Sequence, residues 1–193
     1  MDSQYNTAQG TFRSNTSLLT FSAPLLTSIT GSGRCFENAS KMTTFYAPNL
    51  AGSLASTSFS GCSALNSFTA GPITSLEVSC FSGCSSLTSL TFNDVISVGA
   101  TTFNNCTGLT DLTINNATSI GSQTFNNCTN INIISLRSLT ICGGSTANNN
   151  VFSGIKIGCN ITVPIALQTI NSGAPDGDLV YASGTRGATI IYV

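Results

Sequence analysis

The sequence has no histidine and no tryptophan, and charged residues make up only 7% of its 193 residues. A soluble domain usually carries about a quarter of its residues as charged side chains. Serine, threonine and asparagine must therefore cover most of this surface. The missing histidine also removes the usual base that activates a nucleophilic serine, so the many serines indicate no hydrolase site.

The few charges are nearly balanced and widely dispersed. The net charge is −1, and the six basic residues are scattered along the chain: Arg13, Arg34, Lys41, Arg137, Lys156 and Arg186. This distribution argues against a nucleic-acid site and against a polybasic membrane patch. No apolar run approaches the roughly 20 residues that span a bilayer. The opening residues MDSQYNTAQGTF lack the apolar core of a signal peptide. We expect no nucleic-acid partner, no membrane insertion and no standard export signal.

The chain contains a repeat that is anchored on phenylalanine. The anchors are Phe12, Phe36, Phe59, Phe81, Phe103, Phe125 and Phe152. They are separated by 24, 23, 22, 22, 22 and 27 residues, so the central turns are the most regular. Self-similarity with a period of about 20–29 residues is the signature of a solenoid. Its terminal turns are expected to be atypical because they cap the stack.

Each repeat predicts one short strand. From six to eleven residues after the anchor the sequence reads L-x-x-L-x-F or L-x-x-L-x-I, as in Leu87, Leu90 and Phe92. Alternating apolar and polar residues at its end are typical of a strand with one buried face. The segment around the anchor is too short and too rich in Ser, Thr and Asn for a full helix. We predict a repeat solenoid of about seven turns of 22–24 residues. It would have one parallel sheet, an irregular or short-helical return side and a small C-terminal β element.

The complete repeat resembles the BspA-like leucine-rich repeats. The segment Ile120–Cys128 reads I-G-S-Q-T-F-N-N-C, and Phe81–Leu90 reads F-S-G-C-S-S-L-T-S-L. Together they match the I-G-x-x-x-F-x-x-C start of that repeat and its L-x-x-L continuation. The resemblance covers residues 12–164. It implies a surface-displayed binding or adhesion module rather than an enzyme.

Eight cysteines raise the alternatives of a disulfide framework or a metal site. Four of them follow an anchor by three residues: Cys62, Cys84, Cys106 and Cys128. There is no C-x-x-C pair, and the closest pair, Cys80 and Cys84, has no second pair at zinc-finger distance. We interpret the four as small apolar side chains that pack beside the phenylalanines. Disulfides that involve Cys35, Cys142 or Cys159 stay open. We predict no catalytic, metal-binding or cofactor-binding residue.

The outward positions of the strands form a candidate ligand surface. The residues eight and ten positions after each anchor should face solvent, between buried neighbours. The predicted surface comprises Thr44, Tyr46, Ser67, Thr69, Ser89, Thr91, Asp111, Thr113 and Ser135, together with Ile133. This neutral, hydroxyl-lined surface suits a glycan or a protein, with Tyr46 as an aromatic anchor. The alternative is a solvated sheet that binds nothing.

The period stops after Pro164, and the sequence predicts three regions: an N-terminal arm over 1–11, the solenoid over 12–164 and a tail over 165–193. Two apolar stretches of the tail, Leu179–Ala182 and Ala188–Val193, predict a hairpin or a strand-loop-strand. We expect the tail to leave the repeat axis and to cap the last turn or dock on another subunit. Its expected docking residues are Leu179, Tyr181, Ile190, Ile191, Tyr192 and Val193. Of these, we expect Leu179, Ile190, Ile191 and Val193 to be buried. Arg186 is expected on an exposed loop.

The tail pattern P-D-G-D-L-x-Y-A…G-x-x-x-x-Y-V also resembles C-terminal segments of virion proteins from bacteriophages that infect Bacteroidetes. This resemblance implies a virion component, such as a fibre, decoration or receptor-binding protein. The alternative is a BspA-like adhesin of a bacterial cell surface. Both hypotheses are non-catalytic, and they predict virion or surface proteins, host glycans or proteins, or a second copy of the chain as partners. An enzyme is the third hypothesis.

Overall fold

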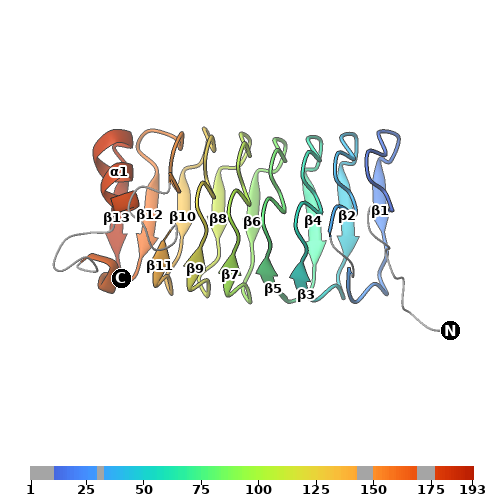
Figure 1. Cartoon of the computed structure of the whole chain (residues 1–193), viewed down its shortest axis with the longest axis horizontal. Helices are drawn as coiled ribbons and strands as arrows, with labels where there is room; N and C mark the ends of the chain where they lie inside the picture. The colour runs from blue at the N-terminus through green and yellow to red at the C-terminus, as the bar shows by residue number, and fades with distance from the viewer. Residues whose placement is uncertain (1–10, 30–32, 143–149, 169–176) are drawn as a thin grey trace.

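The chain forms an elongated solenoid whose turns stack side by side from the N-terminus to the C-terminus (Figure 1). The computed structural model describes residues 11–29, 33–142, 150–168 and 177–193. The N-terminal arm predicted over 1–11 therefore lies outside the described residues, except for Thr11. Leucine, isoleucine and phenylalanine at repeated positions fill the space that each turn encloses.

Eight strands lie in one row along what we call the front face (Figure 1). They are β1 (Thr20–Ser22), β2 (Thr44–Ala47), β4 (Ser67–Ala70), β6 (Ser89–Thr91), β8 (Asp111–Thr113), β10 (Ile133–Ser135), β12 (Asn160–Val163) and β13 (Thr189–Tyr192). All pairings between them are parallel, and equivalent repeat positions are in register, as for Phe45 with Phe68 and Leu90 with Leu112. The predicted parallel stacking is confirmed.

The prediction of one continuous sheet is wrong in two respects. On the front face β1, β2 and β4 form one sheet, and β6, β8, β10, β12 and β13 form another, so that no pairing joins β4 to β6. A further sheet runs along another side of the solenoid, and we call it the second sheet because it lies on this second side. It contains β3 (Gly52–Leu54), β5 (Ile73–Leu76), β7 (Ser97–Val98), β9 (Ser119–Ile120) and β11 (Ile141–Cys142). Its strands form because an outward serine precedes a buried apolar residue in turn after turn, as in Ser75–Leu76 and Ser97–Val98.

The number of turns also differs slightly from the seven that were predicted. In the described part of the chain, five turns carry both a front strand and a strand of the second sheet, from β2 with β3 to β10 with β11. Among the described residues, the first turn and the last two contribute a front strand only. The solenoid is thus most regular at its centre, as the residue intervals indicate.

The anchor phenylalanines form a single stack through the core. Neighbouring rings lie nearly parallel, with centroids 5.2 Å apart for Phe12 and Phe36 and 6.0 Å apart for Phe103 and Phe125. From Phe36 onward every anchor is fully buried. Offset stacking of this kind adds to the free energy gained from burying each ring. The phenylalanine stack therefore holds consecutive turns together along the whole described length.

The return side around each anchor is irregular, as predicted, yet its main chain is ordered by hydrogen bonds between turns. Alternate residues donate to the next turn, as Thr101, Phe103 and Asn105 do to carbonyl oxygens at 2.8–3.0 Å. The residue two positions after the anchor has a positive φ in turn after turn, for example 74° at Gly83 and 59° at Asn105. Glycine and asparagine recur there because they tolerate the left-handed region best.

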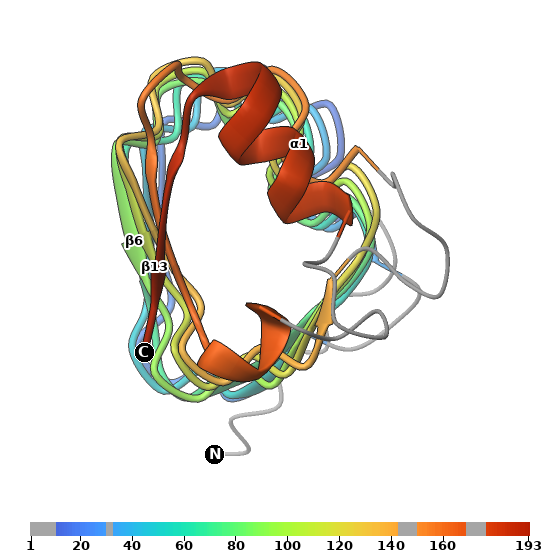
Figure 2. The same ribbon diagram turned by 90° about the vertical axis from the view of Figure 1, so that its left-hand side faces the viewer.

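The C-terminal region is only partly as predicted. Leu179–Ala182 lies in a helix, α1 (Gly177–Arg186), and not in a strand; a short 3-10 helix (Ile165–Gln168) precedes it. The helix forms because Leu179 and Ala182, three residues apart, are both buried on one side of it, and Gly187 ends it with a φ of 58°. Figure 2 shows α1 at the C-terminal end of the solenoid, along one part of its rim. Among the described residues, no helix has the length and apolar character needed to cross a bilayer.

The tail does not leave the repeat axis, because β13 pairs with β12 in parallel register and extends the front sheet. Leu179 is buried as predicted, but Ile191 and Val193 are 41% and 51% exposed. Arg186 is not on an exposed loop: it ends α1, and its guanidinium donates to the carbonyl oxygen of Ile155. Ile191 and Val193 are exposed because the strand alternates inward and outward residues, whereas the prediction buried Ile190, Ile191 and Val193 alike.

Candidate binding face

The predicted ligand surface occupies the outward side of the front strands. We number the positions from the anchor phenylalanine of each turn. At position +8, eight residues after the anchor, Thr44 aligns with Ser67, and Ser89 aligns with Asp111 and Ile133. Position +10 aligns Tyr46 with Thr69, and Thr91 with Thr113 and Ser135. Four of these side chains are exposed (Tyr46, Ser67, Ser89 and Thr91), whereas Thr44, Thr69, Asp111, Thr113 and Ser135 are half-buried between their neighbours. The structure therefore brings the nine residues onto one face.

The two rows are interrupted where the front sheet is interrupted. Tyr46, Thr69 and their neighbours belong to the sheet of β1, β2 and β4, and the residues from Ser89 onward belong to the other sheet. Figure 1 shows a wider interval between β4 and β6 than between the strands on either side. The predicted surface thus consists of an N-terminal part that carries Tyr46 and a C-terminal part that carries Asp111.

Tyr46 is the most prominent side chain of the N-terminal part. Its register neighbours are Ser22 on β1 and Thr69 on β4, both much smaller, and the tyrosine is 42% exposed. The ring therefore projects from a row of hydroxyl groups. In the C-terminal part Asp111 accepts a 2.7 Å hydrogen bond from the Thr110 hydroxyl, and Ser135 donates to Asn115 Oδ1 at 2.6 Å. These local bonds hold the two side chains in place on the face.

The column cysteines lie in the interior, where they are not available for surface chemistry. Cys62, Cys84, Cys106 and Cys128 are fully buried, and each thiol donates at 3.0–3.1 Å to the carbonyl oxygen of the anchor phenylalanine one turn earlier. Burial raises the pKa of the Cys62 and Cys106 thiols to about 12. Because the thiolate is the reactive form, these thiols are poor nucleophiles. Packing beside the phenylalanines is confirmed, and the thiol hydrogen bonds are a feature that the sequence did not indicate.

Other candidate chemistry finds little support in the described part of the chain. No group of three or more metal-ligating side chains gathers there. Of the four cysteines outside the column, Cys159 is a buried free thiol whose pKa is raised to about 12 by burial. The asparagines that follow the anchors form ladders, because the amide of Asn127 donates to Asn105 Oδ1 at 3.1 Å and that of Asn126 donates to Asn104 Oδ1 at 3.3 Å.

The docking residues predicted in the tail separate into two groups. Leu179 and Tyr181 lie on α1, with Leu179 buried and Tyr181 half-buried. On β13 the residues alternate: Ile190 and Tyr192 are half-buried, and Ile191 and Val193 are exposed. The structure therefore assigns Leu179 to the capping of this chain and leaves Ile191 on the outward side of the front face.

Two polar residues of the front face were missed in the sequence: Asn93 and Asp94, which follow β6 beside the gap between β4 and β6. The available signal was a change of repeat type. Before the gap the strands carry Phe then Ala at the two inward positions, as in Phe68 and Ala70, and after it Leu90 and Phe92 take those positions. The exchange of large and small residues marks the turn at which neighbouring strands no longer match.

Comparison with known proteins supports the leucine-rich repeat fold through a family profile and one similar structure. The profile of the BspA type leucine rich repeat region matches in six copies, over residues 3–66 and 70–175. The chain is similar to a leucine rich cell surface protein from Faecalibacterium prausnitzii, with a TM-score of 0.65 and 21% identity over 81% of this chain and 42% of that one. A leucine-rich repeat protein from Bacteroides ovatus aligns over 95% of this chain and 63% of its own, at a TM-score of 0.36 and 15% identity. The chain thus spans less than two thirds of either protein. A search of curated proteins finds no match.

Proposed function

The chain belongs to the BspA-type leucine-rich repeat family, and on that premise we propose that it is a non-catalytic binding protein of a cell surface. Its front face would be the adhesive surface. The observation that carries this proposal is the pair of hydroxyl-rich rows in strand register, from which Tyr46 projects. No residue of the face is assigned a chemical step.

The composition of the face supports binding. Its side chains are short and lie on paired strands, so they lose little conformational freedom when a partner covers them. Tyrosine and serine are the residues that binding loops of antibodies use most, because tyrosine gives a rigid amphipathic contact and serine an adaptable hydrogen bond. Among the predicted residues Asp111 alone is charged. A neutral partner with many hydroxyl or amide groups therefore suits the face better than a polyanion.

A cell-surface location is the version of this proposal that the comparisons favour. The Faecalibacterium prausnitzii protein is described as a cell surface protein, although this chain spans only 42% of its length. The virion role, which the tail pattern predicted, has no support from the family or from the similar structures. We therefore propose surface proteins and glycans outside the cell as partners, and the virion component stays a prediction.

A two-part experiment tests the proposal. The first part locates the chain in its native cells, by protease shaving of intact cells and mass spectrometry of the released peptides. The second part measures how the purified chain adheres to arrays of mucins, matrix proteins and neutral glycans. A front-face variant, Tyr46→Ala with Asp111→Ala, is compared with a matched control, Thr74→Ala with Val78→Ala, whose side chains are exposed outside the front face.

The expected result is that the chain is released by shaving and that adhesion falls about tenfold or more in the front-face variant, because truncating a central aromatic anchor typically costs this much. The control variant should adhere like the parent. Equal adhesion of the front-face variant, or absence of the chain from the cell surface, would contradict the proposal.

A further inference from the structure

The front face opens between β4 and β6, and the opening is confined to that face. The second sheet continues past it, because β5 pairs with β7. The return side also continues, since Phe59 N–H donates to the Cys80 carbonyl at 2.9 Å and Gly61 N–H to the Ser82 carbonyl at 2.7 Å. The turns therefore separate only at the front. The result is a pocket of about 390 Å³, within the lower part of the usual range for small-molecule sites, about 300–1,000 Å³.

The opening follows from the change of repeat type. Phe68 and Phe92 come from successive turns, and their rings lie edge to face with centroids 6.1 Å apart. Phe92 also lies 6.1 Å from the anchor Phe81. Before the gap, alanine occupies the position of Phe92, so the earlier turns pack closely around the stack. The rings of Phe68, Phe81 and Phe92 thus meet in the core between β4 and β6 and keep the two strands apart.

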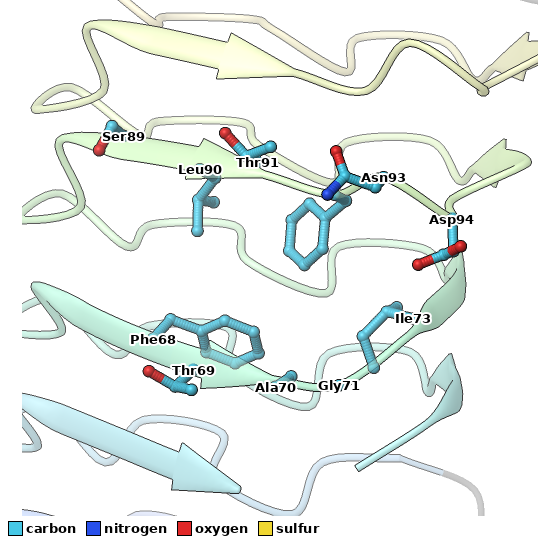
Figure 3. A pocket seen from close by; sticks show the side chains of 11 residues that line it. Phe68, Thr69, Ala70, Gly71, Ile73, Ser89, Leu90, Thr91, Asn93 and Asp94 are labelled. Atoms are coloured by element: carbon cyan, nitrogen blue, oxygen red, sulfur yellow. The ribbon is translucent and has the colours of Figure 1, made fainter. Parts of the chain in front are cut away.

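The pocket reaches the edge of the core. Phe45 and Ala47 are fully buried, but the equivalent residues one turn later, Phe68 and Ala70, are partly exposed. Figure 3 shows Leu90 of β6 pointing towards β4, with Asn93 and Asp94 at the end of the pocket near Ile73. The lining thus combines an apolar floor with polar side chains: Thr69, Ser89, Thr91, Asn93 and Asp94.

Main-chain groups add a donor and an acceptor. In the turns on either side, a 2.9 Å hydrogen bond joins neighbouring front strands, from Ala23 N–H to the Tyr46 carbonyl and from Phe92 N–H to the Thr113 carbonyl. No strand pairing joins β4 to β6. By the register of the other front strands, the N–H of Ala70 and the carbonyl of Thr91 face this gap. Main-chain groups at such a place need water or a ligand as partner.

We infer that this pocket, lined by Thr69, Thr91, Asn93 and Asp94 over Phe68 and Leu90, binds one residue of a neutral saccharide. A sugar hydroxyl can donate one hydrogen bond and accept another. It can therefore pair with the donors and acceptors of the pocket, which come from the exposed strand edges and from the side chains of Thr, Asn and Asp. The C–H face of a pyranose ring packs against an aromatic or aliphatic floor. No basic residue lines the pocket and Asp94 is its one charged side chain, so an anionic ligand is disfavoured. The inference rests on the proposed binding role of the front face and names a ligand class for part of it.

The test is a titration of the isotope-labelled full chain with glucose, galactose, mannose and N-acetylglucosamine, followed by amide chemical shifts. At least one sugar should shift the amides of residues 68–73 and 89–94 saturably, with a Kd of about 1 mM or tighter. Thr91→Val and Asp94→Asn preserve shape and should each weaken binding about tenfold, because each removes hydrogen bonds to the ligand. Glu77→Gln, at a carboxylate that follows β5 outside the front face and outside the pocket, serves as the matched control and should bind like the parent.

If none of the four sugars shifts these amides saturably, or if Asp94→Asn and Thr91→Val bind as tightly as Glu77→Gln, the inference is wrong. Circular dichroism of the three variants checks that each is folded. The adhesion arrays with the Tyr46 and Asp111 variants answer a separate question, so the saccharide site and the adhesive face can fail independently.

Discussion

At the scale of single residues, each column cysteine links two turns. The carbonyl oxygen of Phe81 accepts the N–H of Cys84 in its own turn at 3.1 Å and the thiol of Cys106 in the next turn at 3.1 Å. An apolar residue of similar size would fill the same space but leave the second acceptor position of that buried carbonyl empty. The recurrence of cysteine at this position thus has a hydrogen-bonding reason as well as a packing reason.

The buried thiols predict a pH dependence of stability. The pKa of Cys106 is raised from 9.0 to about 12 by burial, so the folded chain keeps a proton that the unfolded chain releases. This thiol's contribution is complete below pH 9 and is lost as the pH rises from about 9 to about 12, with a slope of up to about 1.4 kcal/mol per pH unit. Urea unfolding of the parent and of Cys106→Ala, between neutral and alkaline pH, isolates this slope by difference. Parallel pH profiles, or rapid labelling of native Cys84, Cys106 and Cys128, would contradict the buried state.

At the scale of the repeating elements, the return turn depends on residues that accept a positive φ. Two positions of each turn take this conformation, for example Thr101 at 56° and Asn105 at 59°, on either side of the anchor Phe103. Position +2 uses glycine in some turns and asparagine in others, and where two asparagines follow each other they bond, as Asn105 and Asn127 do. The element is therefore defined by backbone conformation and not by side-chain size.

Two substitutions at Gly83 test this view. Gly83 has a φ of 74°, and a Cβ built there would lie 3.6 Å from its nearest neighbour, an ordinary contact. Gly83→Val should therefore lower the free energy of unfolding through backbone strain, by about 1–2 kcal/mol. Gly83→Asn is the matched control and should be nearly neutral, because Asn105 occupies the equivalent position in the next turn. Urea unfolding measures both. Equal stability of the two variants would show that φ does not limit this position.

At the scale of the whole molecule, the solenoid is a one-dimensional stack whose C-terminal end is covered. Helix α1 lies at that end, where Asp178 accepts a hydrogen bond from Val151 N–H at 3.2 Å and Arg186 donates to the Ile155 carbonyl. Strand β13 extends the front sheet by one more strand. Because each turn contacts its neighbours only, the loss of an end contact should destabilise the nearest turns first.

Leu179→Ala tests the capping role of α1. Leu179 is 1% exposed, and truncating a buried leucine costs about 2–5 kcal/mol. Hydrogen exchange should accelerate in β12 and β13 but not in β6 and β8, because β10 lies between these two pairs of strands. Val180→Ala, at the exposed neighbouring position, is the control and should change stability by less than about 0.5 kcal/mol. Uniform acceleration along the whole chain would contradict a local cap.

Much of this architecture follows from the sequence alone. The spacing of Phe103, Cys106, Leu109, Leu112 and Ile114 repeats closely enough to predict a solenoid, its parallel strands and its inward residues. The outward rows of the candidate face, including Tyr46 and Asp111, follow from the same alternation. These features depend on contacts between equivalent positions of identical turns, so one repeat contains all the information that they need.

The tertiary structure decided the features that arise where unlike parts meet. The gap between β4 and β6 depends on how Phe68 of one turn meets Phe92 of the next, and neither turn reveals it separately. The segment that forms α1 locally favours a strand, since Leu179, Val180 and Tyr181 are apolar or aromatic. It becomes a helix because the open end of the stack can bury Leu179 and Ala182 together. Short apolar segments do not determine their own conformation, because the free energy of burial depends on the surface that receives them.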